Sequence, residues 1–142
     1  MSYSGKKKRH TKKTLVVIRR STKEIIYVNT YAGHVHDFKM FKNSKLHINS
    51  SYKLLADSGF NGLLKYHKNS VIPHKNSKLI KLNKAQKQQN RALASNRICI
   101  EHVNRELKIF RILKDVYRNK QKRFGLRVNL IAAITNLNKK YA

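Results

Sequence analysis

The sequence predicts a mixed α/β domain, and three observations support this. Short β-branched runs begin the chain, a strand–helix–strand segment follows them, and helical periodicity begins near residue 83. Strands followed by helices in this order are typical of an α/β or α+β layer architecture. The 142 residues suffice for one domain, which we divide into a strand-rich part (1–82) and a helical part (83–142).

The first expected elements are two strands that form a hairpin. Thr14–Arg19 (TLVVIR) and Glu24–Asn29 (EIIYVN) are rich in β-branched and apolar residues, and a Ser-Thr-Lys turn lies between them. The preceding Gly5–Lys13 (GKKKRHTKK) is a run of positive charge, expected as a basic arm or a solvated edge strand.

Shorter elements are expected in the middle of the chain. Asp37 precedes Phe38, Met40 and Phe41, which predicts an N-cap and a short helix. The other expected elements are a strand at Tyr52–Ala56, a helical turn at Gly62–His67 and a short strand that ends at Pro73.

The last third of the chain is expected to be helical. Apolar residues at positions 93, 100, 103, 107 and 110 recur at helical spacing, and no Gly or Pro interrupts Lys84–Gln121. After a loop, a final helix is expected at Arg123–Leu137, and its apolar side is formed by Leu126, Leu130, Ile134 and Leu137.

The charge of the chain indicates its partner. The sequence has 33 Lys and Arg but only six Asp and Glu, so the net charge is +27. Self-repulsion on this scale is best tolerated beside a polyanion, which favours nucleic acid. No apolar run is long enough to span a membrane, no secretory signal is expected, and a single cysteine fits the reducing cytosol.

Two histidine motifs have the spacing of metal ligands. Cys99 and His102 lie three positions apart, but no second pair accompanies them, so a small apolar cysteine and a polar-face histidine are expected. The HVHD segment at 34–37 also lacks a partner cluster, and we expect a loop with a capping aspartate there.

The scarcity of acidic residues makes each one informative. Glu24, Glu106 and Asp115 have structural interpretations, as the start of a strand or as partners of nearby cations, and Asp37 is the expected helix cap. Asp57 and Glu101 remain. Asp57 directly follows an apolar strand, where reactive groups of parallel sheets collect, although an ordinary turn aspartate is the commoner local interpretation.

Glu101 lies among cations of the predicted helix, with Arg97, Arg105 and Lys108 at positions i−4, i+4 and i+7. A surface ion pair is the common outcome of such a pattern. The alternative is that Asp57 and Glu101 hold a divalent cation while Arg and Lys neutralise phosphates. Two carboxylates are few for a two-metal site.

Several motifs together resemble DDE-type transposases, closest to the bacterial insertion-sequence-five group and the related Harbinger-like endonucleases. They are YSGKKKRHT (3–11), GHVHDF (33–38), LADSGF (55–60), NRALASNRICIEHVNRELK (90–108), YRN (117–119) and KRF (122–124). The resemblance implies a ribonuclease H-like fold, bound Mg²⁺ or Mn²⁺, and cleavage and transfer of DNA strands at transposon ends.

The resemblance also implies roles for particular residues. Asp57 matches the second catalytic aspartate and Glu101 the catalytic glutamate, so both are expected to bind metal, whereas Asp37 matches a recurrent position outside the triad. The DNA-phosphate contacts are expected from Lys6, Lys7, Lys8, Arg9, Arg97, Arg105 and Lys108.

The first catalytic aspartate of the family lies upstream of the YSGKKKRHT segment, and no such residue precedes Tyr3 here. The chain is therefore expected to be the C-terminal portion of a bacterial, cytoplasmic and nucleoid-associated transposase, with a fold that lacks its first strand, and to be inactive alone. The expected partners are DNA, an N-terminal half of a split transposase and further copies on DNA. The alternative is a non-catalytic, basic nucleic-acid-binding protein.

Either function predicts that DNA affinity falls steeply with salt. The logarithm of the binding constant should decrease linearly with the logarithm of salt concentration, with a slope of about −0.9 per phosphate contacted, because each contact releases condensed counterions. Fluorescence anisotropy with a labelled duplex at several NaCl concentrations measures this slope. A salt-independent affinity would contradict both functions.

Overall fold

The computed structural model describes residues 3–4, 9–76, 81–114 and 123–141, and for residues 3–4, 9–10 and 114 the backbone alone. The chain divides into two compact units. The first comprises residues 1–35 and 99–142, and the second comprises residues 36–98. Residues 5–8 of the basic segment and residues 115–122, which include Asp115 and the loop expected around 119–122, lie outside the described residues.

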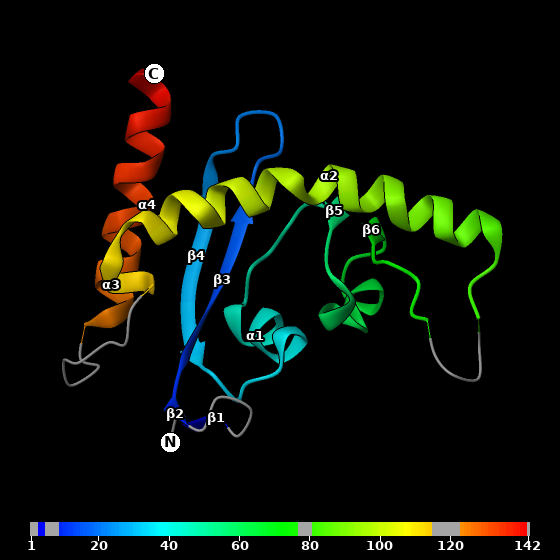
Figure 1. The fold of residues 1–142 in the computed structure, drawn as a ribbon, viewed down its shortest axis with the longest axis horizontal. Helices are drawn as coiled ribbons and strands as arrows, with labels where there is room; N and C mark the ends of the chain where they lie inside the picture. Colours follow the sequence, from blue (N-terminus) through cyan, green and yellow to red (C-terminus); the bar gives the residue numbers. More distant parts are fainter. Residues whose placement is uncertain (1–2, 5–8, 77–80, 115–122, 142) are drawn as a thin grey trace. The chain divides into compact units, whose positions relative to one another are not determined.

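The first unit is built on an antiparallel hairpin, as the sequence predicts. Strand β3 (Lys12–Ile18) pairs with β4 (Ile25–Ala32), and the register places Val16 opposite Val28 (Figure 1). Both strands differ from the expected bounds: β3 begins two residues earlier, and β4 runs three residues further. The extension ends at Gly33, whose N–H donates to the Thr11 carbonyl at 2.8 Å. Strands β1 (Tyr3–Ser4) and β2 (Arg9–His10) form a second short antiparallel pair.

Helices cover one face of the β3–β4 hairpin. The helices of this unit are the C-terminal part of α2 (Lys84–Ile109), the short α3 (Arg111–Lys114) and α4 (Phe124–Tyr141), which packs on β4 (Figure 1). The helical run expected up to Gln121 breaks at Phe110, between α2 and α3. The core cluster consists of Ile25, Val103, Leu107, Ile131 and Ala132.

The final helix buries a different face from the one that the sequence suggests. The buried residues of α4 are Phe124, Val128, Ile131, Ala132 and Thr135. The expected apolar side, with Leu126, Leu130, Ile134 and Leu137, is exposed. Both faces are apolar, so periodicity alone could not distinguish the buried face from the exposed one.

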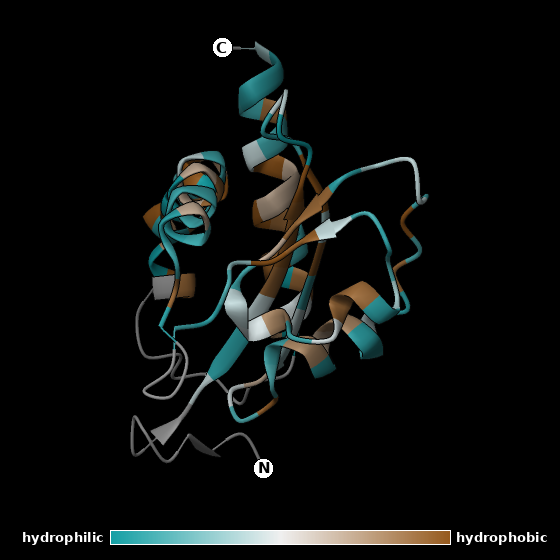
Figure 2. Ribbon diagram, turned by 90° about the vertical axis from the view of Figure 1, so that its right-hand side faces the viewer, coloured by the Kyte–Doolittle hydropathy of each residue, from teal (hydrophilic) through white to brown (hydrophobic). Residues whose placement is uncertain are grey.

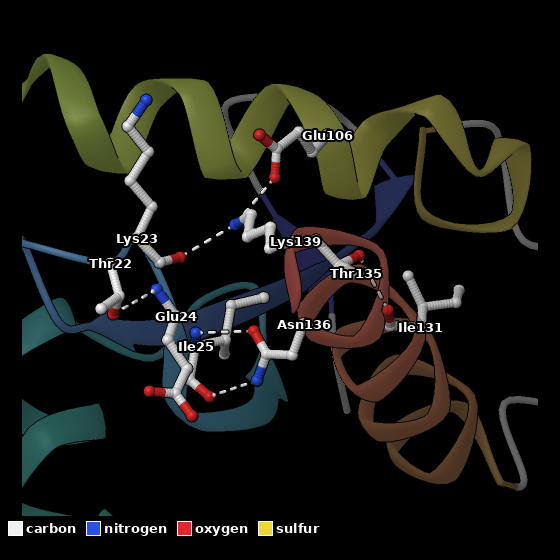
Figure 3. A network of polar contacts seen from close by, with 9 residues as sticks. All are labelled: Thr22, Lys23, Glu24, Ile25, Glu106, Ile131, Thr135, Asn136 and Lys139. Carbon is white, nitrogen blue, oxygen red and sulfur yellow. Dashed lines mark hydrogen bonds and ion pairs between the residues drawn. The ribbon is translucent and has the colours of Figure 1, made fainter. Parts of the chain in front are cut away.

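Polar contacts fasten α4 to the start of β4. Asn136 accepts from the Ile25 N–H through Oδ1 at 2.8 Å and donates through Nδ2 to the Ile25 carbonyl at 2.9 Å (Figure 3). Lys139 donates a hydrogen bond to the Lys23 carbonyl at 2.8 Å. Its Nζ also lies 2.8 Å from Glu106 Oε2, an ion pair whose geometry is not that of a hydrogen bond. The amide of Asn136 thus occupies the position of a neighbouring strand, and the ion pair of Glu106 with a cation is confirmed.

The other face of β4 carries a tyrosine pair. Asn29 donates to the hydroxyl oxygens of Tyr27 at 3.2 Å and Tyr31 at 3.4 Å. Burial of the Tyr31 hydroxyl, together with its hydrogen bond and charge interaction with Tyr27, raises the pKa of Tyr31 to about 12.

The second unit combines short helices with a minimal parallel sheet. Its elements are α1 (Asp37–Ser44), strands β5 (Leu54–Leu55) and β6 (Ser70–Val71), the 3₁₀ turns η2 (Ser58–Phe60) and η3 (Leu63–Lys65), and the N-terminal part of α2. Both strands are shorter than the sequence suggests, and they are parallel. The helical turn expected at Gly62–His67 is confirmed by η3.

Side chains, more than strand pairing, hold the second unit together. Buried His67 lies 3.2 Å from the Ser70 hydroxyl and 3.3 Å from the Asn49 carbonyl. Asn90 of α2 accepts from the His74 N–H at 2.9 Å and donates to the His74 carbonyl at 3.0 Å, which anchors the segment after β6 to the helix.

We predict that Asn136→Ala lowers the free energy of unfolding by about 1–3 kcal/mol, because two hydrogen bonds are lost and the Ile25 backbone groups lose their partner. Asn136→Asp keeps the acceptor but turns a carboxylate oxygen toward the Ile25 carbonyl oxygen, so at neutral pH it should cost at least as much as Asn136→Ala. Asn138→Ala is the matched control: it lies on the same helix, is exposed and makes the same change in helix propensity. Urea denaturation followed by circular dichroism measures these differences, and equal losses for Asn136→Ala and Asn138→Ala would contradict the prediction.

Candidate functional site

Asp57 lies two residues after β5 and caps the short turn η2. Its Oδ1 accepts from the Ser58 N–H at 2.7 Å and from the Arg97 guanidinium at 3.1 Å. The Asp57 side chain is 54% exposed and the Arg97 side chain 26% exposed. The bond from the Ser58 N–H is the ordinary contact of a capping aspartate. The carboxylate is also accessible to solvent and is held by the Arg97 guanidinium of α2.

Asp37 does not cap α1, contrary to the sequence-based prediction. The helix begins at Asp37 itself, and extended His36 is the N-cap residue without a side-chain hydrogen bond. The Asp37 carboxylate instead lies against η2, and its Oδ2 is 2.5 Å from the position that a Cβ on Gly59 would take. Only glycine at position 59 permits this approach without displacing the carboxylate.

A second carboxylate therefore contacts the segment that begins at Asp57. Sequence reasoning assigned Asp37 to a cap because Asp is common there, and it did not connect Asp37 with LADSGF. The available signal was the pair of glycines, Gly59 and Gly62, that follow Asp57. Gly62 has a φ of +97°, and a Cβ there would lie 2.9 Å from the Phe38 ring, so both glycines accommodate the start of α1.

Glu101 is exposed on α2, within the first unit, whereas Asp57 belongs to the second. Arg105 and Lys108 are exposed on the same helix, as a role in phosphate binding requires. Arg97 is engaged with Asp57. Its guanidinium is therefore an ion-pair partner of a carboxylate in this structure, and its predicted contact with a DNA phosphate stays a prediction.

The remaining predicted contacts can be described only in part. Lys6, Lys7 and Lys8 lie outside the described residues, and Arg9 is placed in β2 by its backbone alone. Cys99 is a half-buried free thiol and His102 is exposed. Among the described residues, no group of three or more His, Cys, Asp or Glu side chains could hold a metal ion.

Comparison with protein families decides the class of this chain. Residues 1–136 match the family described as DDE superfamily endonuclease. The chain belongs to this family of endonucleases. It is also 49% identical over 134 residues to the protein named "Probable transposase for insertion sequence element IS702" from Microchaete diplosiphon. No solved structure matches the chain.

The chain spans about half the length of this curated relative: the alignment covers 94% of the chain and 49% of the relative. The family match thus makes the chain a DDE superfamily endonuclease sequence, and the pairwise identity shows its similarity to a probable transposase. Throughout the described residues, no helix is both long and apolar enough to cross a lipid bilayer.

DDE superfamily endonucleases generally use divalent metal ions. The donors in this chain fit such an ion in kind, because exposed carboxylate oxygens are the ligands that Mg²⁺ prefers. They do not form a complete site, since the described residues contain no cluster of three ligands.

We predict that Asp57→Asn changes the free energy of unfolding by less than about 1 kcal/mol. The asparagine Oδ1 can still accept from the Ser58 N–H, and an exposed ion pair contributes little to stability. Asp57→Ala removes the cap as well and should cost about 1–2 kcal/mol. Urea denaturation tests both variants, with Arg97→Gln as the control that removes only the ion pair. An Asn variant as unstable as the Ala variant would contradict the prediction.

Proposed function

We propose that the chain is the C-terminal portion of a DDE transposase of the insertion-sequence-five group, which cleaves and transfers DNA strands at transposon ends. In this proposal residues 1–142 form one partial domain with a ribonuclease H-like fold. The family match over residues 1–136 carries the proposal, and the exposed carboxylate of Asp57 after a parallel strand supports it.

Asp57 and Glu101 are the proposed metal ligands. When bound, a divalent ion activates the attacking oxygen and stabilises the leaving oxygen of a phosphodiester. Residues of the chain orient Asp57 and offset its charge. The Ser58 N–H and the Arg97 guanidinium both donate to Asp57 Oδ1, and Arg97 offsets the negative charge of the carboxylate. In this proposal a metal ion takes over that role, or Arg97 moves to a DNA phosphate. Exposed Arg105 and Lys108 neutralise DNA phosphates beside Glu101.

Two carboxylates are too few to hold two metal ions, so we propose that the 142-residue chain alone cleaves no DNA. The third carboxylate is proposed to come from the part of a transposase that the IS702 relative contains outside the match, supplied in the same polypeptide or in trans. DNA binding needs no metal, because a net charge of +27 is sufficient for phosphate contacts.

Metal titration tests the proposed ligands. We expect the chain to bind Mn²⁺ weakly in isothermal titration calorimetry, with an affinity reduced at least tenfold in Asp57→Asn and in Glu101→Gln. Glu24→Gln is the matched control, because Glu24 is an acid paired with Arg19 at 3.2 Å and has no proposed ligand role. Arg97→Gln should strengthen Mn²⁺ binding, since a neighbouring positive charge is removed.

Equal Mn²⁺ binding by all variants would refute the ligand assignment and leave a basic DNA-binding protein as the function. Strand cleavage is measured separately, with a supercoiled plasmid and Mg²⁺. Cleavage by the chain alone that is lost in Asp57→Asn would confirm Asp57 but contradict the proposed inactivity.

A further inference from the structure

An exposed aromatic ring at the end of η3 contacts α1 in the second unit. Tyr66 directly follows η3, and 58% of this residue is exposed. The centroid of its ring lies 5.5 Å from that of Phe38 at an interplanar angle of 69°, the edge-to-face geometry of an aromatic pair. The Lys42 ammonium lies 5.5 Å from the centroid of the Tyr66 ring, within the range of a cation–π contact. We call Tyr66, Phe38 and Lys42 together the Tyr66 platform.

The local structure fixes the position of this ring. The Tyr66 N–H donates to the carbonyl of Leu63 at 2.9 Å, and Leu63 itself is 1% exposed, so the turn that carries Tyr66 is anchored in the second unit. Gly62 allows the same turn to approach the Phe38 ring closely. A ring that is already held in place loses little conformational entropy when a ligand covers it.

The segment that carries the platform is strongly basic. Six lysines between positions 37 and 70 are exposed, namely Lys39, Lys42, Lys45, Lys53, Lys65 and Lys68. The acids of this segment are Asp37, which lies against Gly59, and Asp57, which pairs with Arg97. Along α1, the teal of hydrophilic residues accordingly alternates with the brown of hydrophobic residues in Figure 2. Aromatic rings among cations are typical of surfaces that bind single-stranded nucleic acid, because bases stack on the rings while the cations contact phosphates.

Helix α1 connects the platform with the segment of Asp57. Asp37, at the start of α1, lies against Gly59 of η2, the turn that Asp57 caps. Lys42 lies five positions further along α1, a rise of about 7.5 Å, which is roughly two base steps of a DNA strand. The platform and Asp57 are therefore within reach of the same strand.

We propose that the Tyr66 platform binds an unpaired nucleotide of single-stranded DNA, with the base stacked on the Tyr66 ring and Lys42 in contact with a phosphate. The inference rests on the proposed function in its choice of DNA as the ligand, and it requires no metal ion. Duplex DNA offers the same phosphates but keeps its bases inside the helix. An acidic polypeptide satisfies the lysines but brings no base to the ring, so single-stranded DNA fits both features of the platform.

Fluorescence anisotropy with a labelled oligothymidine, in the presence of EDTA, tests the stacking. We expect Tyr66→Ala to weaken binding about tenfold, as the loss of one stacked base does, and Tyr66→Phe to leave binding unchanged because the ring is kept. Tyr52→Ala is the matched control, the same substitution at a tyrosine of the second unit that is 68% exposed, and it should not change the affinity. An abasic strand with the same number of phosphates should bind equally to the unsubstituted chain and to Tyr66→Ala. Full affinity of Tyr66→Ala for oligothymidine, or the same loss for the abasic strand or for polyglutamate, would overturn the proposal.

The salt dependence of the same binding separates the role of Lys42 from that of Tyr66. Lys42→Gln should make the slope of log affinity against log salt concentration less steep by about 0.7, the value for one phosphate of a single strand. Tyr66→Ala should leave the slope unchanged, because stacking releases no counterions. An unchanged slope in Lys42→Gln would contradict the proposed phosphate contact.

A spectroscopic measurement reports stacking even if a variant alters the affinity. The chain contains no tryptophan, so Tyr66→Trp and Tyr52→Trp each introduce a single reporter. Saturating oligothymidine should quench the fluorescence at position 66 about twofold or more, because a stacked base contacts the indole, whereas the abasic strand should not. Neither strand should change the fluorescence at position 52. Equal effects of the two strands at position 66 would refute the stacking. Because no metal ion is present, the Mn²⁺ titrations of Asp57 and Glu101 can fail without changing these results, and the two proposals fall separately.

Discussion

The first unit depends on one side-chain amide. Asn136 satisfies both backbone groups of Ile25 across 111 positions of sequence, and it does so at the point where the core residue Ile25 enters β4. A two-stranded hairpin is marginal on its own, so the hairpin needs the helix as much as the helix needs the hairpin. Asn90 holds the His74 backbone of the second unit in the same way. In both units, an asparagine amide hydrogen-bonds the backbone N–H and C=O of one residue, as a neighbouring strand would.

Charge imposes the second constraint. With six acids against 33 basic residues, few carboxylates are available to offset the repulsion. Among the described residues, ion pairs join Glu24 to Arg19, Glu106 to Lys139 and Asp57 to Arg97. The first two join or flank core elements, whereas the third places a guanidinium on an exposed carboxylate. That arrangement orients Asp57 while leaving it accessible, as its proposed role as a metal ligand requires.

The third constraint is the distribution of apolar surface. The first unit buries one side of α4, while Leu126, Leu130 and Leu137 on the other side are exposed.

The local pattern of the chain determined the elements that depend on neighbouring residues. β-branched runs predicted the β3–β4 hairpin, and helical spacing predicted α2 and α4. The scarcity of acidic residues and the family motifs both indicated Asp57 and Glu101 as metal ligands, which remains a proposal. Only the tertiary structure decided which side of α4 is buried, because both sides are apolar. It also decided that Asp37 lies against Gly59 and not at a helix cap, and that Arg97 pairs with Asp57, 40 positions away. These features depend on contacts between distant segments. Gly59 and Gly62 are compatible with the close approach of α1, but the sequence of each segment alone does not identify its partner.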